Sequence, residues 1–208
     1  MTRNLLYFLF CILPFLGIAQ DRQMTPAEIS AFQKSLQGLA ELKTLEADFN
    51  QYKYMSFMKK PIEASGKLYI RQPDRLSWFY IAPFQYKMVF KDNKIFINDQ
   101  GKKSSLNLGN NKQFEKISRL IASGIRGGRY DEKEFTVSYF KQDGLNLVKL
   151  LPKANDAKKY IKEIRLLFSK SDNQVQEVML MEPSNDYTRF VLKNKKINTT
   201  LHDSVFNL

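Results

Sequence analysis

The chain has 208 residues, a length typical of a single domain with a short leader. It carries 33 Lys and Arg against 21 Asp and Glu, a net charge of +12, with one cysteine and one histidine. The cysteine, Cys11, falls in the N-terminal leader described next. The rest of the chain therefore has no thiol, which excludes a disulfide-stapled scaffold.

Residues 1–19 have the pattern of a secretory signal peptide. Arg3 precedes the apolar run Leu5–Ile18, which at about 14 residues is too short for a membrane span. Gly17 and Ala19 are small residues at positions −3 and −1 of a cleavage site. We expect cleavage after Ala19 and a single domain over residues 20–208. An intact or lipidated N-terminus in mass analysis would contradict this.

The positive charge is spread along the chain. Paired lysines recur at Lys102-Lys103, Lys158-Lys159 and Lys195-Lys196, without a long basic run. Export argues against nucleic acid, which basic chains often bind. Two interpretations stay open: a solvated surface, or weak attraction to an anionic membrane or an acidic partner.

The first predicted element is an amphipathic helix over residues 25–40. Thr25-Pro26-Ala27-Glu28 has the form of a capping box with proline at the first helical position. Ile29, Phe32, Leu36 and Leu39 follow at helical spacing. Such a stripe must pack on another element, most simply a sheet.

A hairpin centred on Pro73-Asp74 is the main strand signal. Residues 62–70 alternate between apolar and polar side chains, and the aromatic run Arg75–Tyr80 follows the turn. Before it, Leu45, Ala47 and Phe49 alternate with polar residues, and the phase changes at Gln51-Tyr52. That change predicts a β-bulge.

The remaining segments read mostly as strands in hairpin succession. A second amphipathic helix carries Phe114, Ile117, Leu120 and Ile121 and ends at Gly124. The other expected strands are 86–90 and 94–98 around Asp92-Asn93, a short one at Leu106 and Leu108, 135–140 and 145–151 around Asp143-Gly144, 164–168 and 175–181 around Asp172-Asn173, 188–192, and 205–208. About ten such strands predict an antiparallel meander that curls.

Nothing in the chain has the pattern of an enzyme. His202 has no Ser or Cys beside it in a known motif, and there is no zinc-type spacing. The Gly-rich segment 124–129 follows a helix and lacks the phosphate-loop pattern, so we interpret it as a helix stop and connection. We expect no catalytic residue, metal or cofactor.

Several short motifs together resemble the LolA family of periplasmic outer-membrane lipoprotein carriers. They are Phe49-Asn50-Gln51, Ser65-Gly66-Lys67-Leu68, Pro73-Asp74-Arg75-Leu76-Ser77-Trp78 and Pro83. The leader, the length and the order of helix and strands fit as well. The resemblance implies a mainly β α+β fold, a curved, unclosed antiparallel β-barrel of about eleven strands with lid helices over an apolar cavity.

The resemblance also implies a function without catalysis. Such a carrier is a periplasmic monomer that shields the acyl chains of lipoproteins between an inner-membrane transporter and an outer-membrane acceptor. An acyl chain contributes roughly 0.8 kcal/mol for each buried CH₂, so the cavity must be apolar. The candidate cavity residues are Phe49, Leu68, Ile70, Leu76, Trp78, Tyr80, Met88, Phe90, Phe96, Phe114, Ile117, Leu120, Ile121, Phe168 and Met179.

One departure from the family pattern concerns the lid. The family usually has an arginine directly before the hairpin proline, where the resemblance implies a latch, and Gln72 stands there in this chain. Arg71 and Arg75 are the neighbouring cations, so the latch candidates are Gln72, Arg75 and Arg71. We expect the lid to open more readily than in the family.

Two further functions stay open. The segment from Met181 to Phe206 is similar to LolA-like proteins of polyene-pigment or lipid pathways, which makes a polyene lipid or glycolipid an alternative cargo. A lipoprotein-sensing domain is the other alternative.

Overall fold

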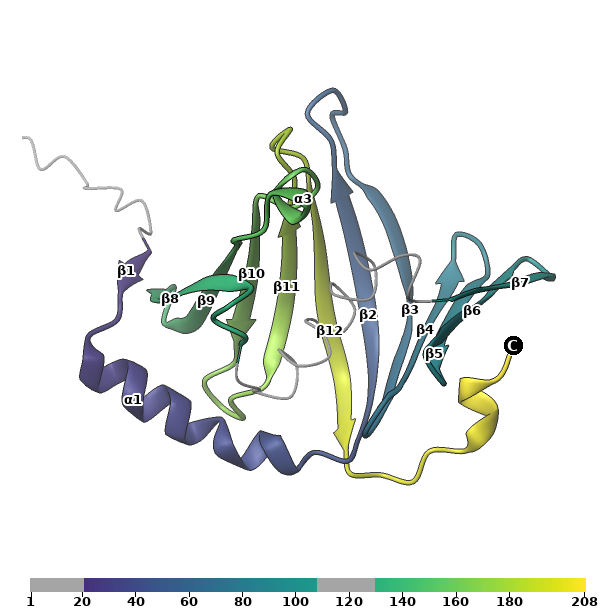
Figure 1. Cartoon of the computed structure of the whole chain (residues 1–208), viewed down its shortest axis with the longest axis horizontal. Helices are drawn as coiled ribbons and strands as arrows, with labels where there is room; N and C mark the ends of the chain where they lie inside the picture. Colours follow the sequence, from purple (N-terminus) through teal and green to yellow (C-terminus); the bar gives the residue numbers. More distant parts are fainter. Residues whose placement is uncertain (1–20, 108–129) are drawn as a thin grey trace, which may run out of the picture.

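The structure, a computed structural model, describes residues 21–107 and 130–208. Their strands form one antiparallel sheet of twelve, in the order β1-β8-β9-β10-β11-β12-β2-β3-β4-β5-β6-β7 (Figure 1). The strands are β1 Arg22–Gln23, β2 Thr44–Tyr54, β3 Ile62–Arg71, β4 Arg75–Ala82, β5 Tyr86–Lys91, β6 Lys94–Asp99, β7 Lys102–Asn107, β8 Phe135–Gln142, β9 Leu145–Pro152, β10 Glu163–Phe168, β11 Val175–Met181 and β12 Tyr187–Ile197. The predicted leader and the predicted helix around Phe114 lie outside the described residues.

The sheet is open and is built from two runs of hairpins. Strands β2 to β7 pair in sequence order, and so do β8 to β12. The two runs join where β12 pairs with β2, with Leu192 opposite Phe49. The end strands β1 and β7 do not pair with each other, which confirms the expected open antiparallel sheet.

The turn residues explain why the hairpins form where the sequence predicts them. Asp92 and Asn93 both have positive φ, 52° and 58°, the conformation of the two-residue turns that match strand twist. Asp143 and Gly144 adopt the same region, with φ of 48° and 80°. Asparagine, aspartate and glycine tolerate this conformation best, so these pairs fix the strand register.

Two predictions about secondary structure are wrong, and two short elements were not predicted. Strand β2 is regular through Gln51-Tyr52, so there is no bulge there. The tyrosines that suggested a phase change, Tyr52 and Tyr54, lie on the other face of a straight strand. Residues 205–208 are not a strand, because Asp203–Phe206 forms a short 3-10 helix, η3. The short strand β1 and the helix α3, Asn155–Lys158, have no signal in the sequence.

The helix α1, Pro26–Ser35, begins at the predicted capping box. The hydroxyl of Thr25 accepts a hydrogen bond from the backbone N–H of Glu28, and the Glu28 carboxylate accepts one from the N–H of Thr25. A 3-10 turn, η1 at Gln37–Glu41, follows the helix. Figure 1 shows α1 running along the lower edge of the sheet.

Apolar side chains pack on both faces of the sheet. The larger core joins α1 and η1 to one face, which we call the inner face and define by Phe49, Trp78 and Phe190. A smaller core lies on the opposite, outer face. There, Leu201 and Phe206 cover Val89; they belong to residues 198–208, which follow β12 and which we call the C-terminal segment. The C-terminal segment therefore belongs to the outer layer, and α1 to the inner one.

Candidate functional site

The inner face carries a continuous apolar surface across the middle of the sheet. Alternation along each strand places every second side chain on this face. Cross-strand pairs then align them into rows, such as Leu68 opposite Trp78 and Trp78 opposite Met88. Leu68 and Trp78 are buried, whereas Met88 is half-buried. We call these residues, together with the aromatic group described next, the inner-face cluster.

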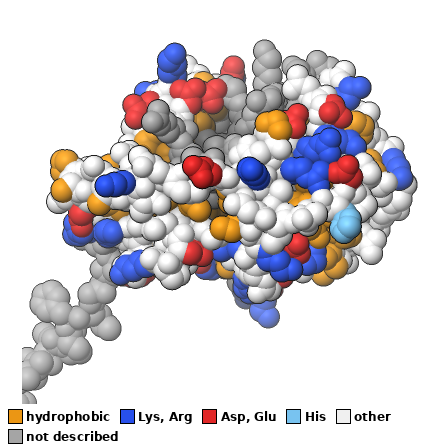
Figure 2. All heavy atoms as spheres, turned by 90° about the horizontal axis from the view of Figure 1, so that it is seen from below, with side chains coloured by type: hydrophobic (Ala, Val, Ile, Leu, Met, Phe, Trp, Pro, Cys, Tyr) orange, Lys and Arg blue, Asp and Glu red, His pale blue; other side chains and the backbone are white. Residues whose placement is uncertain are grey.

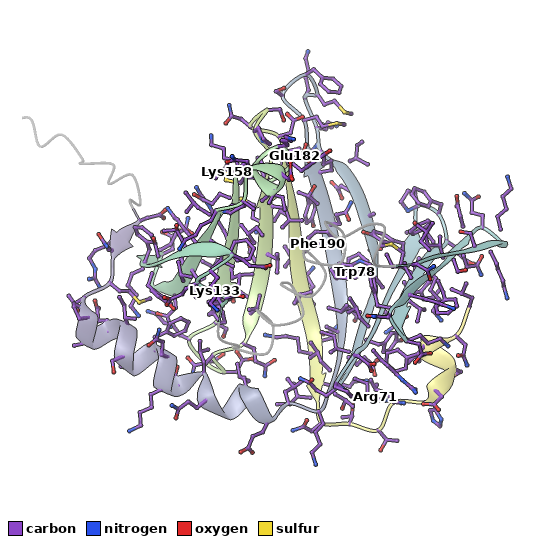
Figure 3. The ribbon with its side chains drawn as sticks, in the orientation of Figure 1. Arg71, Trp78, Lys133, Lys158, Glu182 and Phe190 are labelled. Atoms are coloured by element: carbon purple, nitrogen blue, oxygen red, sulfur yellow. The ribbon has the colours of Figure 1, made fainter. Side chains whose placement is uncertain are left out.

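Aromatic rings form the centre of the inner-face cluster. The ring centroid of Phe49 lies 5.1 Å from that of Trp78 and 6.2 Å from that of Phe190. The rings of Trp78 and Phe190 meet edge to face with their centroids 5.1 Å apart, and Figure 3 shows both residues near the middle of the sheet. Tyr80 adds a fourth ring, 5.0 Å from Phe49. Three of these four contacts are edge to face, one of the two arrangements that aromatic pairs prefer, and the Phe49–Trp78 pair is tilted by 48°.

Gly66 explains how the Phe49 ring fits into this group. Gly66 is on β3, where it lies opposite Phe49 of β2 on one side and Tyr80 of β4 on the other. A Cβ atom at residue 66 would lie 2.8 Å from the Cζ of Phe49 and 2.0 Å from the carbonyl oxygen of Phe79. Only glycine leaves room for this approach, which accounts for the glycine in the Ser65-Gly66-Lys67-Leu68 motif.

One polar pair lies among the aromatic rings. The hydroxyl of Tyr80 donates a hydrogen bond to Oε1 of Gln51 at 2.7 Å. Burial raises the pKa of Tyr80 to about 12. Because β2 is regular, Gln51 faces inward, and Tyr80 satisfies its oxygen. The Gln of the Phe49-Asn50-Gln51 motif thus places an amide within an otherwise apolar surface.

The Tyr80 pKa predicts a loss of stability at alkaline pH. The folded protein keeps a proton that the unfolded chain loses near pH 10, so stability falls as pH rises from about 10 to about 12. We expect Tyr80 alone to contribute about 2–3 kcal/mol of this loss. Urea denaturation at neutral and alkaline pH measures it. Tyr80→Phe should reduce the alkaline loss, while the exposed Tyr160→Phe should not. An equal loss in Tyr80→Phe would contradict the assignment.

The structure brings nine of the predicted cavity residues together in the core of the inner face. They are Phe49, Leu68, Ile70, Leu76, Trp78, Tyr80, Met88, Phe90 and Phe168. The predicted residues Phe114, Ile117, Leu120 and Ile121 lie outside the described residues.

Two of the predicted cavity residues lie on the wrong face. Phe96 packs against Val89 and the C-terminal segment on the outer face. Met179 lies opposite Arg189 and Arg165, between the inward-facing Val178 and Leu180. Both predictions are wrong for one reason. Strands β6 and β11 carry apolar residues at successive positions, so alternation of hydrophobicity did not identify the inner side.

Some residues of the inner face were missed by the sequence analysis. Phe190 is the most important, because it contacts both Phe49 and Trp78. Its signal was weak, since Phe190 has polar Arg189 on one side and apolar Val191 on the other. Phe32 of α1 was predicted as a helix residue, but its edge-to-face contact with Phe168 at 5.1 Å could not be foreseen.

The latch candidates contact the C-terminal segment and the backbone. Arg71 donates hydrogen bonds to the carboxylate of Asp203 and to the carbonyl oxygen of Leu201, and its guanidinium lies 4.9 Å from the ring centroid of Phe206. Arg75 approaches Asp203 at 3.5 Å. The backbone N–H of Gln72 donates to the carbonyl of Lys43 at 2.8 Å. Among the described residues, the two arginines therefore fasten the C-terminal segment.

The underside of the molecule shows this region. Figure 2 looks from below and shows Lys and Arg side chains gathered on one side of that face, with acidic side chains among them. Figure 3 places Arg71 at the lower end of the sheet beside the C-terminal segment. The Arg71 guanidinium lowers the pKa of the Asp203 carboxyl below its ordinary value, so the contact is between charged groups at neutral pH.

Loss of Arg71 should release the C-terminal segment. In Arg71→Ala we expect the amides of Val205 and Asn207, which close the η3 turn, to exchange hydrogen about tenfold faster, because bonds to charged groups are lost. Hydrogen-exchange mass spectrometry measures this. Arg75→Ala is the matched control and should have a smaller effect. Unchanged exchange in Arg71→Ala would show that the apolar contacts of Phe206 suffice.

Comparison with known proteins identifies the family. The family model described as outer membrane lipoprotein carrier protein LolA matches residues 40–208. The chain belongs to the LolA family. Two relatives named outer-membrane lipoprotein carrier protein agree. The one from Dechloromonas aromatica is 29% identical over 141 residues, covering 67% of this chain and 65% of its own length. The one from Chromobacterium violaceum is 27% identical over 182 residues, covering 87% and 84%.

Solved structures share the fold of this LolA family member at low identity. An uncharacterised conserved protein from Thermus thermophilus gives a TM-score of 0.52 at 8% identity, covering 87% of this chain and 93% of that one. A DUF1329 family protein from Desulfovibrio piger gives 0.50 at 10% identity, covering 88% and 98%. These similarities concern the fold alone.

The described residues contain neither a membrane-spanning helix nor a metal site. Within residues 21–107 and 130–208, no helix combines the length and the apolar character that a bilayer span requires. In the same two ranges, no three His, Cys, Asp or Glu side chains come together as a metal site would need.

Proposed function

We propose that this LolA family member is a periplasmic, non-catalytic carrier that binds the acyl chains of lipoproteins on its inner face. The observation that carries the proposal is the aromatic group of Phe49, Trp78 and Phe190 at the centre of an open sheet. Aromatic and methionine side chains adapt to irregular chains, and Met88 lies beside Trp78. Membership of the family supports lipoprotein as the cargo.

The polar groups on this surface fit an amphiphile better than a pure hydrocarbon. Gln51 accepts from Tyr80 through its oxygen, and no described residue accepts from its amide N–H groups, which can donate to a ligand carbonyl. Tyr130 packs against the core of the inner face, and its buried hydroxyl has no hydrogen-bond partner among the described residues. Burial raises the pKa of Tyr130, so the hydroxyl stays neutral and can donate a hydrogen bond. An ester or amide at the head of an acyl chain supplies the matching acceptor.

Within this proposal, the protein works as a monomer between two membranes. It receives a lipoprotein from an inner-membrane transporter and delivers it to an outer-membrane acceptor. The names of the curated relatives support this role. Export through the leader at residues 1–19 provides the location.

A second cargo, a polyene lipid or glycolipid, is favoured by one observation. The position before Pro73 is Gln72, and both neighbouring arginines contact Asp203 of the C-terminal segment. Within the part of the chain that the structure describes, the side chains of both arginines are therefore directed to the C-terminal segment and not to a lid, unlike the latch that the family pattern implies.

Trp78 offers a direct test, because it is the only tryptophan of the chain. Acyl chains carrying bromine quench the fluorescence of a tryptophan that they contact. We expect saturable quenching of Trp78 by a brominated phospholipid, reversed by the same lipid without bromine. The quencher acrylamide, added without lipid, provides the baseline for solvent access. Saturable binding of the lipid without quenching would place the site elsewhere, and absence of binding would contradict the proposal.

A further inference from the structure

The turn between β2 and β3 exposes large apolar side chains. We call residues 55–61 the hairpin tip. Phe57 is 79% exposed, the most of any large apolar residue described, and Met58 is 41% exposed. Ile62, directly after the tip, is 46% exposed. Figure 1 shows this hairpin extending beyond the other turns of the sheet. Several exposed apolar residues together at a protruding end indicate an interaction site.

The hairpin tip is held by specific hydrogen bonds. The N–H of Met58 donates to the carbonyl of Met55 at 2.9 Å, which closes a turn. The N–H of Ser56 donates to the carboxylate of Asp186 in the neighbouring β11–β12 turn, also at 2.9 Å. Below them, Lys53 forms an ion pair with Glu182, which Figure 3 shows near the upper end of the sheet. These contacts fix the conformation of the turn that carries Phe57.

Two lysines accompany the apolar residues. Lys59 and Lys60 are exposed, and neither forms an ion pair with any residue in the described ranges. The nearby acids have other partners: Glu182 pairs with Lys53, and Asp186 accepts a hydrogen bond from the backbone N–H of Ser56. Apolar side chains beside unpaired lysines are typical of segments that lie in a membrane interface.

A second turn at the same edge of the sheet adds to this surface. Strands β3 and β4 are antiparallel and pair Ser65 with Ala82, so the β4–β5 turn lies on the side of the hairpin tip. Ile81, near the end of β4, is 46% exposed, and Phe84, in the turn itself, is 50% exposed. Exposed apolar residues therefore lie at two neighbouring places on this edge of the sheet, the hairpin tip and the β4–β5 turn. The two lysines lie in the hairpin tip.

We propose that the hairpin tip docks the protein on a membrane surface that contains anionic phospholipid. Phe57 and Met58 enter the headgroup region, and Lys59 and Lys60 bind lipid phosphates. A bilayer fits better than a protein partner, because the cores of protein interfaces are depleted in lysine. The net charge of +12 also favours an anionic surface. This inference does not depend on the cargo, since the tip lies on a turn, away from the inner-face cluster.

Vesicle flotation tests the proposal with the whole exported protein. We expect the protein to float with phosphatidylcholine vesicles that contain phosphatidylglycerol, and more weakly without it or at high salt. The double variant Phe57→Ser, Met58→Ser should lower the partition coefficient at least about tenfold. Lys59→Gln and Lys60→Gln should each lower it about fivefold, and together they should remove the preference for phosphatidylglycerol.

Two controls separate this proposal from others. Leu106→Ser removes an apolar residue of similar exposure, 47%, from β7 and should leave flotation unchanged. Met88→Glu alters the inner-face cluster and should also leave it unchanged, so loss of cargo binding is distinguished from loss of docking. Equal flotation of the tip variant would contradict the proposal. The proposal would also be contradicted if the wild-type protein bound neither kind of vesicle. Crosslinking of the hairpin tip to a protein alone, without binding to vesicles, would be one such result.

Discussion

Replacing Gly66 with alanine is expected to destabilise the fold by about 3 kcal/mol, the cost of overpacking a site that cannot relax. The added Cβ would lie 2.0 Å from the carbonyl oxygen of Phe79, a backbone atom, and 2.8 Å from the ring of Phe49. Neither can move without disturbing the pairing of β3 with β4 or the aromatic group. Denaturant unfolding of the two proteins measures the difference.

Gly38→Ala is the matched control for this experiment. Gly38 lies in the 3-10 turn η1, and a Cβ there would meet no atom within 4 Å. We expect a change within about 0.5 kcal/mol, as for ordinary surface substitutions. If Gly66→Ala were as mild as Gly38→Ala, the close packing of Phe49 over β3 would be wrong.

Placing a charge on the inner face is expected to weaken binding of an acyl chain at least tenfold, or about 1.4 kcal/mol. Met88→Glu is suited to this test, because Met88 is half-buried beside Trp78 and its replacement leaves the fluorescent reporter in place. A carboxylate there would lose its hydration when the chain binds. Titration of brominated lipid against Trp78 fluorescence gives the dissociation constants.

Met179→Glu provides the control of the same chemistry. Met179 is half-buried on the outer face between Arg165 and Arg189, which pair with Glu163 and Glu177, so a carboxylate there lies among charged groups and away from the bound chain. We expect binding within about twofold of wild type. Equal losses in the two variants would show that the outer face contributes to the site, and no loss in either would remove the inner face as the binding surface.

Local signals explain why most of the strands could be predicted. The turn pairs Asp92-Asn93 and Asp143-Gly144 have backbone conformations that few other residues adopt, and each pair joins the two strands of a hairpin. The capping box at Thr25 likewise depends on residues three positions apart. Such features are present in the sequence itself, so a reading of neighbouring residues finds them.

The assignment of residues to faces needed more than local signals. Ile95, Phe96 and Ile97 are all apolar, and only pairing of Ile97 with Met88 shows that Phe96 points outward. A second apolar layer on the outer face, made by Leu201 and Phe206, hides the difference between the two sides. Alternation predicts a face only where the other face is polar.

Long-range contacts explain the remaining differences. Arg71 contacts Asp203 across more than a hundred residues, a pairing that no spacing in the sequence suggests. The partner of Gln51 is Tyr80, two strands away, and this hydrogen bond accounts for a polar residue on an apolar face. The sequence indicated a family and a kind of surface, whereas the structure shows how individual side chains are used.

Native mass spectrometry of the protein isolated from the periplasm of cells that produce lipoproteins shows directly whether the protein binds lipoproteins. We expect a one-to-one complex with an acylated lipoprotein, which Met88→Glu reduces and Met179→Glu preserves. Protein that is isolated only with a polyene lipid or glycolipid, or that shows no bound amphiphile in either wild type or control, would contradict the role of lipoprotein carrier.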